Sequence, residues 1–101
     1  MMNISVKAIH FNADSKLIAF IEKKLQRLSR FFDREITAEV HLKLQSTGSQ
    51  VQQKIAEVHL KVPGGWLVDK KVDQSFESAI LASTETLKRQ LIRYKEKNLG
   101  K

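Results

Sequence analysis

Two segments of the chain alternate apolar and polar residues one by one, and this pattern constrains the fold more than any other feature. ITAEVHLKL occupies residues 36–44 and KIAEVHLKV occupies residues 54–62. Successive side chains of a strand point to opposite faces, so each segment predicts a strand with one apolar and one polar face. The turn sequence PGG at residues 63–65 and WLVDKKV at residues 66–72 predict a hairpin and a third antiparallel strand. The middle of the chain is therefore a meander whose apolar face has to be covered.

Two segments with helical spacing flank this meander. The first runs from residue 16 to about 32 after the cap candidates of NADS, residues 12–15. Its apolar residues recur at intervals of four, four, three and four: Leu17, Ile21, Leu25, Leu28 and Phe32. The second follows Asp73, a plausible N-cap. Its apolar face consists of Phe76, Ile80, Leu87, Leu91 and Tyr94.

The remaining element is NISVKAIHF at residues 3–11, which has strand propensity. Its imperfect alternation indicates a strand that is partly buried on both faces. The element order is therefore β-α-β-β-β-α, and both helices need the same apolar sheet face. This predicts an α+β fold: a two-layer sandwich, with a four-stranded sheet and both helices on one face. A chain of 101 residues is expected to form a single domain over residues 1–101.

The positive charge is concentrated in two segments. The formal net charge is +7, and residues 16–34 hold six lysines and arginines against two acidic residues. Residues 86–101 hold another six against Glu96 alone. This asymmetry indicates a polyanionic partner, either nucleic acid or an acidic membrane surface.

Within each helix the basic residues gather on arcs. On an ideal wheel, four basic residues of the first helix fall within about 40° of Lys16: Lys23, Arg27, Arg30 and Arg34. The last helix carries Arg89, Arg93 and Lys97 on one side of its apolar face and Lys88 and Lys95 on the other. A merely solvated face usually mixes charges, which gain from pairing one turn apart. The arcs therefore favour a binding surface, and the guanidinium groups suit phosphate oxygens.

Other residue types give little support to catalysis or metal binding. The chain has no cysteine and no phosphate loop, nucleophile elbow or zinc-protease motif. His41 and His59 are expected on the outward face of neighbouring strands, where we interpret them as exposed polar residues because nothing else completes a metal site. Trp66 is interpreted as packing at the sheet end and Phe31 as the end of the helix. We therefore predict no catalytic residues, no metal, no cofactor and no small-molecule substrate.

Several stretches resemble one known family. They are MNI at residues 2–4, KKLQRLSRFF at 23–32, VPGG at 62–65, DQSFESAI at 73–80 and LKRQLIRYKEK at 87–97. Together with the element order, they resemble the ribosome hibernation-promoting factor family, also called the ribosome-associated inhibitor or sigma-54 modulation protein family. The resemblance covers essentially the whole chain and is to a short form without the C-terminal dimerisation domain of longer members. In one departure, Leu81 stands where the family usually has an acidic residue.

The resemblance implies a bacterial protein that binds the small ribosomal subunit and its rRNA in stationary phase or stress. It implies that the messenger and transfer RNA channel is blocked and translation repressed. Carried over by position, the family's basic ridge corresponds to Lys24, Arg27, Arg30, Arg89, Arg93 and Lys97. Charge alone adds Lys23, Lys88 and Lys95 to the predicted RNA-binding set.

Two alternatives remain open from the residues alone. One is an RNA- or DNA-binding regulator that acts away from the ribosome. The other is a basic peripheral membrane protein, which is disfavoured because the sheet needs the apolar helix faces. Without a leader or membrane segment the chain is expected to be cytoplasmic. It is also expected to be a monomer off the ribosome, with a mobile loop at residues 45–53.

Overall fold

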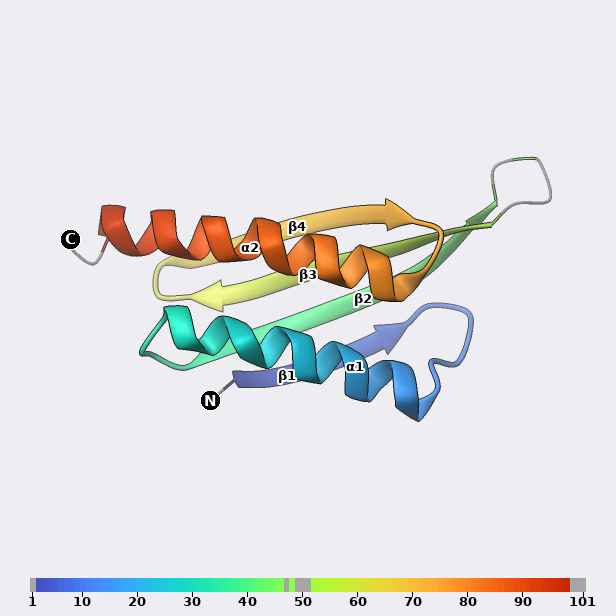
Figure 1. Cartoon of the computed structure of the whole chain (residues 1–101), viewed down its shortest axis with the longest axis horizontal. Coiled ribbons are helices and arrows are strands. Elements are labelled where there is room, and N and C mark those ends of the chain that lie inside the picture. The colour runs from blue at the N-terminus through green and yellow to red at the C-terminus, as the bar shows by residue number, and fades with distance from the viewer. Residues whose placement is uncertain (1, 47, 49–51, 99–101) are drawn as a thin grey trace.

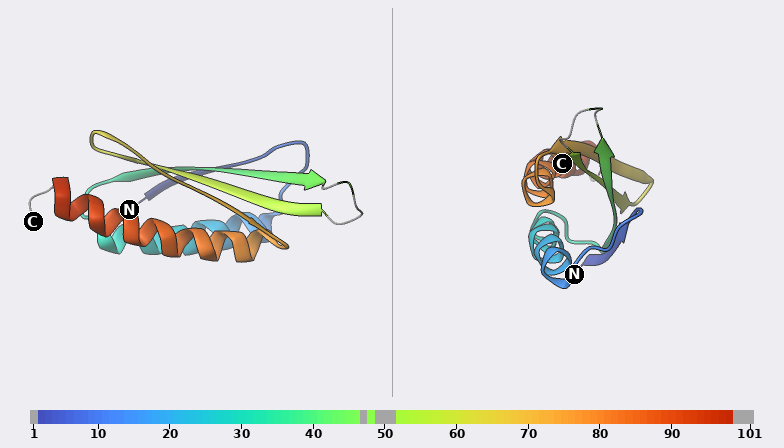
Figure 2. Two further views of the ribbon diagram at one scale, coloured as in Figure 1. Left: turned by 90° about the horizontal axis from the view of Figure 1, so that it is seen from above. Right: turned by 90° about the vertical axis from the view of Figure 1, so that its right-hand side faces the viewer.

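The computed structural model describes residues 2–46, 48 and 52–98 and arranges them in a sheet layer and a helix layer (Figures 1 and 2). The elements in chain order are β1 (Met2–Ala8), α1 (Ser15–Gln26), the 3-10 helix η1 (Arg27–Phe31), β2 (Ile36–Ser46), β3 (Gln52–Val62), β4 (Gly65–Asp73) and α2 (Phe76–Asn98). The predicted α+β sandwich of order β-α-β-β-β-α is confirmed.

The four strands form one sheet in the order β1-β2-β3-β4. β1 and β2 are parallel, as the intervening helix α1 requires, whereas β2, β3 and β4 are antiparallel neighbours. Pro63 and Gly64 form the turn between β3 and β4, and Val62 pairs with Gly65. Gly64 has a φ of +87°, a left-handed conformation that glycine adopts without steric cost.

The core lies between the two helices and the inner face of the sheet. Ile21 and Leu25 of α1 and Leu87 and Leu91 of α2 are fully buried. They belong to one cluster with the inward residues of the central strands: Ala38, Val40, Leu42, Ala56, Val58 and Leu60. Figure 2 shows both helices on the same side of the sheet, so the opposite face is open.

The first strand differs from the prediction. β1 ends at Ala8 rather than residue 11, and its burial alternates regularly, with Asn3, Ser5 and Lys7 exposed. The irregular pattern came from residues 9–11, which follow the strand. His10 there has a φ of 66°, which is incompatible with a continuing strand.

The first helix is also shorter than predicted. Asp14 is its N-cap and accepts a 2.8 Å hydrogen bond from the Leu17 amide, but the α-helix ends at Gln26. The chain then tightens into η1, where the Ser29 hydroxyl donates to the Gln26 carbonyl at 2.7 Å. This change of pitch still buries Leu28 and Phe32. It also places Arg34 beyond the helix, so the predicted α-helical arc does not extend to that residue.

The second helix begins after a different cap from the one predicted. The Ser78 amide donates to Ser75 Oγ at 3.1 Å, so Ser75 caps α2. Asp73 instead accepts a 2.7 Å hydrogen bond from the next amide, at Gln74. In the turn between β4 and α2, the Asp73 and Ser75 side chains therefore each accept a hydrogen bond from a backbone amide.

The predicted loop at residues 45–53 is shorter in the structure, because β2 continues to Ser46 and β3 begins at Gln52. Residues 47 and 49–51 of that loop lie outside the described residues.

Candidate nucleic-acid interface

A groove of about 330 Å³ lies between the first helical segment, which consists of α1 and η1, and the helix α2. The helices run side by side along the sheet (Figure 1). Most of the side chains that line the groove are exposed or half-buried, so it is open to solvent. Its walls are formed by Lys24, Arg27, Leu28, Arg30, Phe31, Leu81, Thr84, Glu85 and Lys88. Two separate basic segments of the sequence therefore meet at one concavity.

The charge in this groove is strongly positive. Lys24, Arg27, Arg30 and Lys88 are opposed by the single carboxylate of Glu85. Among residues 2–46, 48 and 52–98, the only salt bridge of a lysine or arginine joins Lys71 to Asp69, on another part of the molecule. The groove cations therefore have no acidic partner there and are available to an anionic ligand.

Phe31 lines the groove together with these cations. The sequence prediction did not include it among the site residues. Its half-buried ring has the Lys88 ammonium 5.1 Å from its centroid, within cation–π range. Lys95 donates to the Phe31 carbonyl at 3.4 Å. In the Phe31–Phe32 pair only Phe32 is buried in the core, as expected for adjacent residues at a tight turn. The adjacency of two phenylalanines is the sequence signal from which an accessible aromatic ring could have been predicted, because adjacent side chains point in different directions.

The nine predicted RNA-binding residues fall into distinct positions. Lys24, Arg27, Arg30 and Lys88 line the groove, and Lys95 reaches across to η1 beside it. The other four are exposed and do not line the groove: Lys23 on α1 and Arg89, Arg93 and Lys97 on α2. On α2, Lys88 and Lys95 are the predicted residues that face the first helical segment. Both were included in the predicted RNA-binding set because of their charge alone.

Leu81 is part of the groove wall, beside Leu28 and Phe31. Its side chain is 44% exposed although it is aliphatic. The residue that departs from the family pattern therefore places an aliphatic side chain, rather than a carboxylate, in the α2 wall of the groove beside Glu85 and Lys88.

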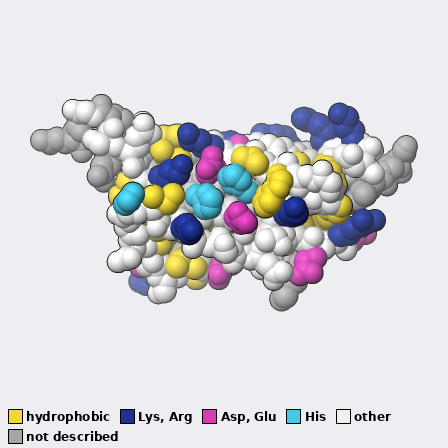
Figure 3. Space-filling model, turned by 180° about the vertical axis from the view of Figure 1, so that it is seen from behind, with side chains coloured by type: hydrophobic (Ala, Val, Ile, Leu, Met, Phe, Trp, Pro, Cys, Tyr) yellow, Lys and Arg dark blue, Asp and Glu magenta, His cyan; other side chains and the backbone are white. Residues whose placement is uncertain are grey.

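The open face of the sheet has a mixed character (Figure 3). β2 and β3 present charged residues and histidines on it, as predicted, but β4 adds Trp66, Val68 and Val72, each more than 40% exposed. Trp66 does not pack at the sheet end. Its ring lies on this face, with the Lys61 ammonium 5.0 Å from its centroid.

The prediction that nothing else near His41 and His59 completes a metal site was wrong. Their rings are neighbours, with centroids 5.5 Å apart, and Glu57 joins them as a third potential metal ligand.

In the part of the chain that is described, no helix is long and apolar enough to cross a bilayer. The large apolar residues of α1 and α2 mostly face the core, with Leu81 and Ile92 exposed. A peripheral membrane protein would need such a helix face to be free.

Known proteins resemble this chain in sequence and in fold. The family described as sigma 54 modulation protein / S30EA ribosomal protein matches residues 4–98. A ribosome hibernation promoting factor of Pseudomonas putida is 30% identical over 96 residues, which are 95% of this chain and 89% of that protein. One from Azotobacter vinelandii is 31% identical over 98 residues, 97% of this chain and 87% of that protein.

A solved structure extends the likeness to three dimensions. The N-terminal domain of Protein Y from Thermus thermophilus superimposes with a TM-score of 0.81 at 29% identity. The match covers 92% of this chain and 99% of that domain. With the family match over almost the whole length, these relatives show that the chain belongs to the sigma 54 modulation protein / S30EA ribosomal protein family.

Proposed function

We propose that this chain is a ribosome hibernation factor that binds the small ribosomal subunit through the groove between the first helical segment and α2. The observation that carries the proposal is the groove itself, where four cations from two helical segments surround an accessible aromatic ring. The names of the Pseudomonas and Azotobacter relatives agree with this role. The exposed residues Lys23, Arg89, Arg93 and Lys97, with Lys95, would extend the contact beyond the groove.

The groove suits folded RNA better than a small molecule. Arginine and lysine side chains at its rim can bind phosphate oxygens, and the Phe31 ring can stack on an unpaired base. Such contacts recognise shape and backbone, which positions a protein on an RNA surface without reading a sequence. Both walls stand on helices that are packed on the sheet, so the backbone positions that carry the cations are fixed before binding.

The consequence we propose is repression of translation. A rigid domain bound in the channel for messenger and transfer RNA would exclude both and leave an intact, inactive ribosome in the cytoplasm during stationary phase or stress. The test is co-sedimentation of the purified chain with separated ribosomal subunits, followed by initiation assays in a cell-free extract. We expect the chain in the small-subunit fraction and a fall in initiation. Binding to free RNA or DNA with no subunit association would instead favour a regulator that acts away from the ribosome.

Replacing Thr84, a half-buried groove residue, with glutamate should weaken binding to the small subunit by about tenfold or more, since a carboxylate added to the groove wall competes with phosphate for the cations there. The control is Val68→Glu, because Val68 is exposed but lies on the open sheet face. Equilibrium binding of both variants to the small subunit checks the prediction. Equal losses from the two substitutions would show that the groove has no special role.

We also propose that the chain is a monomer when it is not bound to a ribosome. Trp66, Val68 and Val72 are the exposed apolar residues of the open face, and charged residues of β2 and β3 adjoin them. Obligate interfaces are larger and more apolar than this strip. Light scattering should give the monomer mass at micromolar and at near-millimolar concentrations. A dimer mass that does not change on dilution would refute this proposal.

A further inference from the structure

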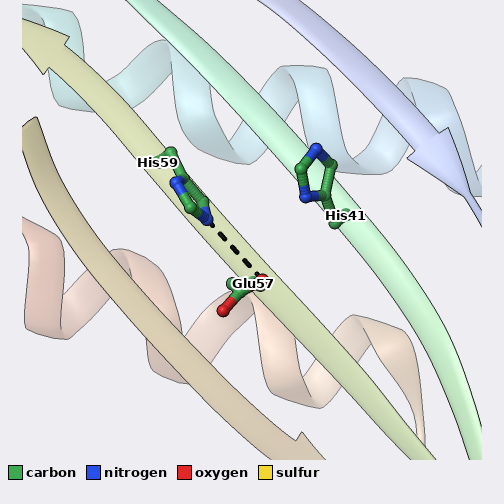
Figure 4. Close-up of side chains that lie close together, drawn as sticks. All are labelled: His41, Glu57 and His59. Atoms are coloured by element: carbon green, nitrogen blue, oxygen red, sulfur yellow. Dashed lines mark ion pairs between the residues drawn. The ribbon is translucent and has the colours of Figure 1, made fainter.

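His41 of β2 and Glu57 and His59 of β3 form a cluster on the open face of the sheet (Figure 4). Each offers one metal-binding atom, and these atoms all lie within 4.8 Å of one another. All three residues are half-buried, so the cluster is accessible from solvent but partly enclosed by its neighbours. It lies on the face opposite the helices and is independent of the proposed ribosome contact.

The sheet itself holds the three residues together. Glu57 stands directly opposite His41 in the pairing of β2 with β3. His59 follows Glu57 by two positions, so it points to the same face, and it is paired with Glu39. Both strands have a neighbour on each side, so their backbones are held by hydrogen bonds along both edges. A metal bound here would therefore meet ligands that are already positioned.

The hydrogen bonding of this cluster is incomplete. His59 Nε2 is inaccessible to solvent and has no hydrogen-bond partner among the described residues. Its nearest acidic atom is Glu57 Oε1 at 3.6 Å, which is too long for a hydrogen bond. Buried polar atoms are rarely left without a partner, because desolvation then carries a full uncompensated penalty. A cation between the imidazole and the carboxylate would satisfy both.

We propose that His41, Glu57 and His59 form a binding site for a divalent transition-metal ion, with Zn²⁺ the best fit among common ions. Imidazole nitrogen and carboxylate oxygen are both ligands of zinc, whereas Mg²⁺ and Ca²⁺ prefer oxygen ligands alone. Tetrahedral zinc with bonds of about 2.0–2.1 Å needs ligand atoms roughly 3.3 Å apart. The present separations of at most 4.8 Å are near that distance, so the proposal requires only that the side chains rotate while the strands stay in place.

The surroundings set the remaining features of the site. Three protein ligands leave one tetrahedral position for water or for the carboxylate of Glu39, which is in register with His59. Lys7 is paired with His41, and Lys70 is paired with Glu57. Because these two positive charges repel a metal ion, we expect weaker binding than at an all-histidine site without neighbouring charges.

Calorimetric titration of the full chain with Zn²⁺, and separately with Mg²⁺, tests this inference. We expect one Zn²⁺ per chain and no measurable Mg²⁺ binding. His41→Ala, His59→Ala and Glu57→Gln should each lower the Zn²⁺ affinity by about tenfold or more, because even loss of an outer-sphere partner has an effect of that size. All three side chains are on the surface of the sheet, and thermal unfolding without metal will show that the variants remain folded.

The third histidine supplies the matched control. His10 lies outside the cluster, and its left-handed backbone tolerates asparagine, so His10→Asn should leave Zn²⁺ binding unchanged. Absence of saturable Zn²⁺ binding by the unmodified chain would overturn the inference. So would binding that survives the double substitution of His41 and His59, or that is lost equally in the His10 variant.

Discussion

Replacing both Arg27 and Lys88 with glutamate should lower the affinity of the chain for the small ribosomal subunit by about 100-fold or more. The two residues stand on opposite walls of the groove. Each is expected to form a charge-assisted hydrogen bond to phosphate, for which about 1.5–3 kcal/mol is typical. The slope of log affinity against log salt concentration should also become shallower, by roughly 0.7–0.9 for each phosphate contact that is lost. Titration of labelled protein with small subunits at several salt concentrations measures both effects.

A charge-matched control separates local contact from net charge. Lys7→Glu combined with Lys61→Glu changes the net charge equally, but both lysines are exposed on the open face of the sheet. This variant should lose much less affinity, and its salt dependence should be close to that of the unmodified chain. Arg89→Glu with Arg93→Glu should fall between the two, because those exposed arginines lie on α2 outside the groove. If the Lys7 and Lys61 variant lost the most affinity, the binding surface would be the sheet.

Replacing Leu87 with alanine should destabilise the fold by about 2–5 kcal/mol, the usual range for a leucine fully enclosed in a core. Leu87 has no solvent exposure and belongs to the cluster that joins α2 to the sheet. For a domain of this size the melting temperature should fall by about 4–8 °C for each kcal/mol. Urea and thermal unfolding measure the loss.

The control for this prediction is Ile92→Ala on the same helix. Ile92 is 38% exposed, so its truncation should change stability by about 0.5 kcal/mol or less. Equal destabilisation by the two substitutions would mean that α2 does not pack through Leu87, and the orientation of the groove would be wrong with it.

The fold could be predicted from the sequence because its strongest patterns are local. The alternation of residues 36–44 identified the inward side chains of β2, and Ala38, Val40 and Leu42 are fully buried. The capped helix and the PGG turn followed from equally short motifs. The end of α1 could not be predicted, since the spacing of Leu28 and Phe32 suits an α-helix as well as the observed η1.

The candidate site was predicted only in part, because its composition depends on how α2 is rotated against α1. Lys88 and Arg89 are adjacent in sequence and both positively charged, yet only Lys88 lines the groove. The same limit applies to the open face. Both histidines were expected there, but the juxtaposition of Glu57 with His41 depends on the register of β2 and β3, which their alternation alone leaves undetermined.

Site-specific photo-cross-linking tests the central claim most directly, namely that the groove is the surface in contact with small-subunit rRNA. A photoreactive amino acid would replace Glu85, an exposed groove residue, or Val68 on the open face. Each protein would be bound to small subunits, irradiated, and the cross-linked RNA mapped. The proposed interface predicts strong rRNA cross-links at residue 85 within the messenger and transfer RNA channel and few at residue 68. Cross-links to rRNA from residue 68 with none from residue 85 would contradict it.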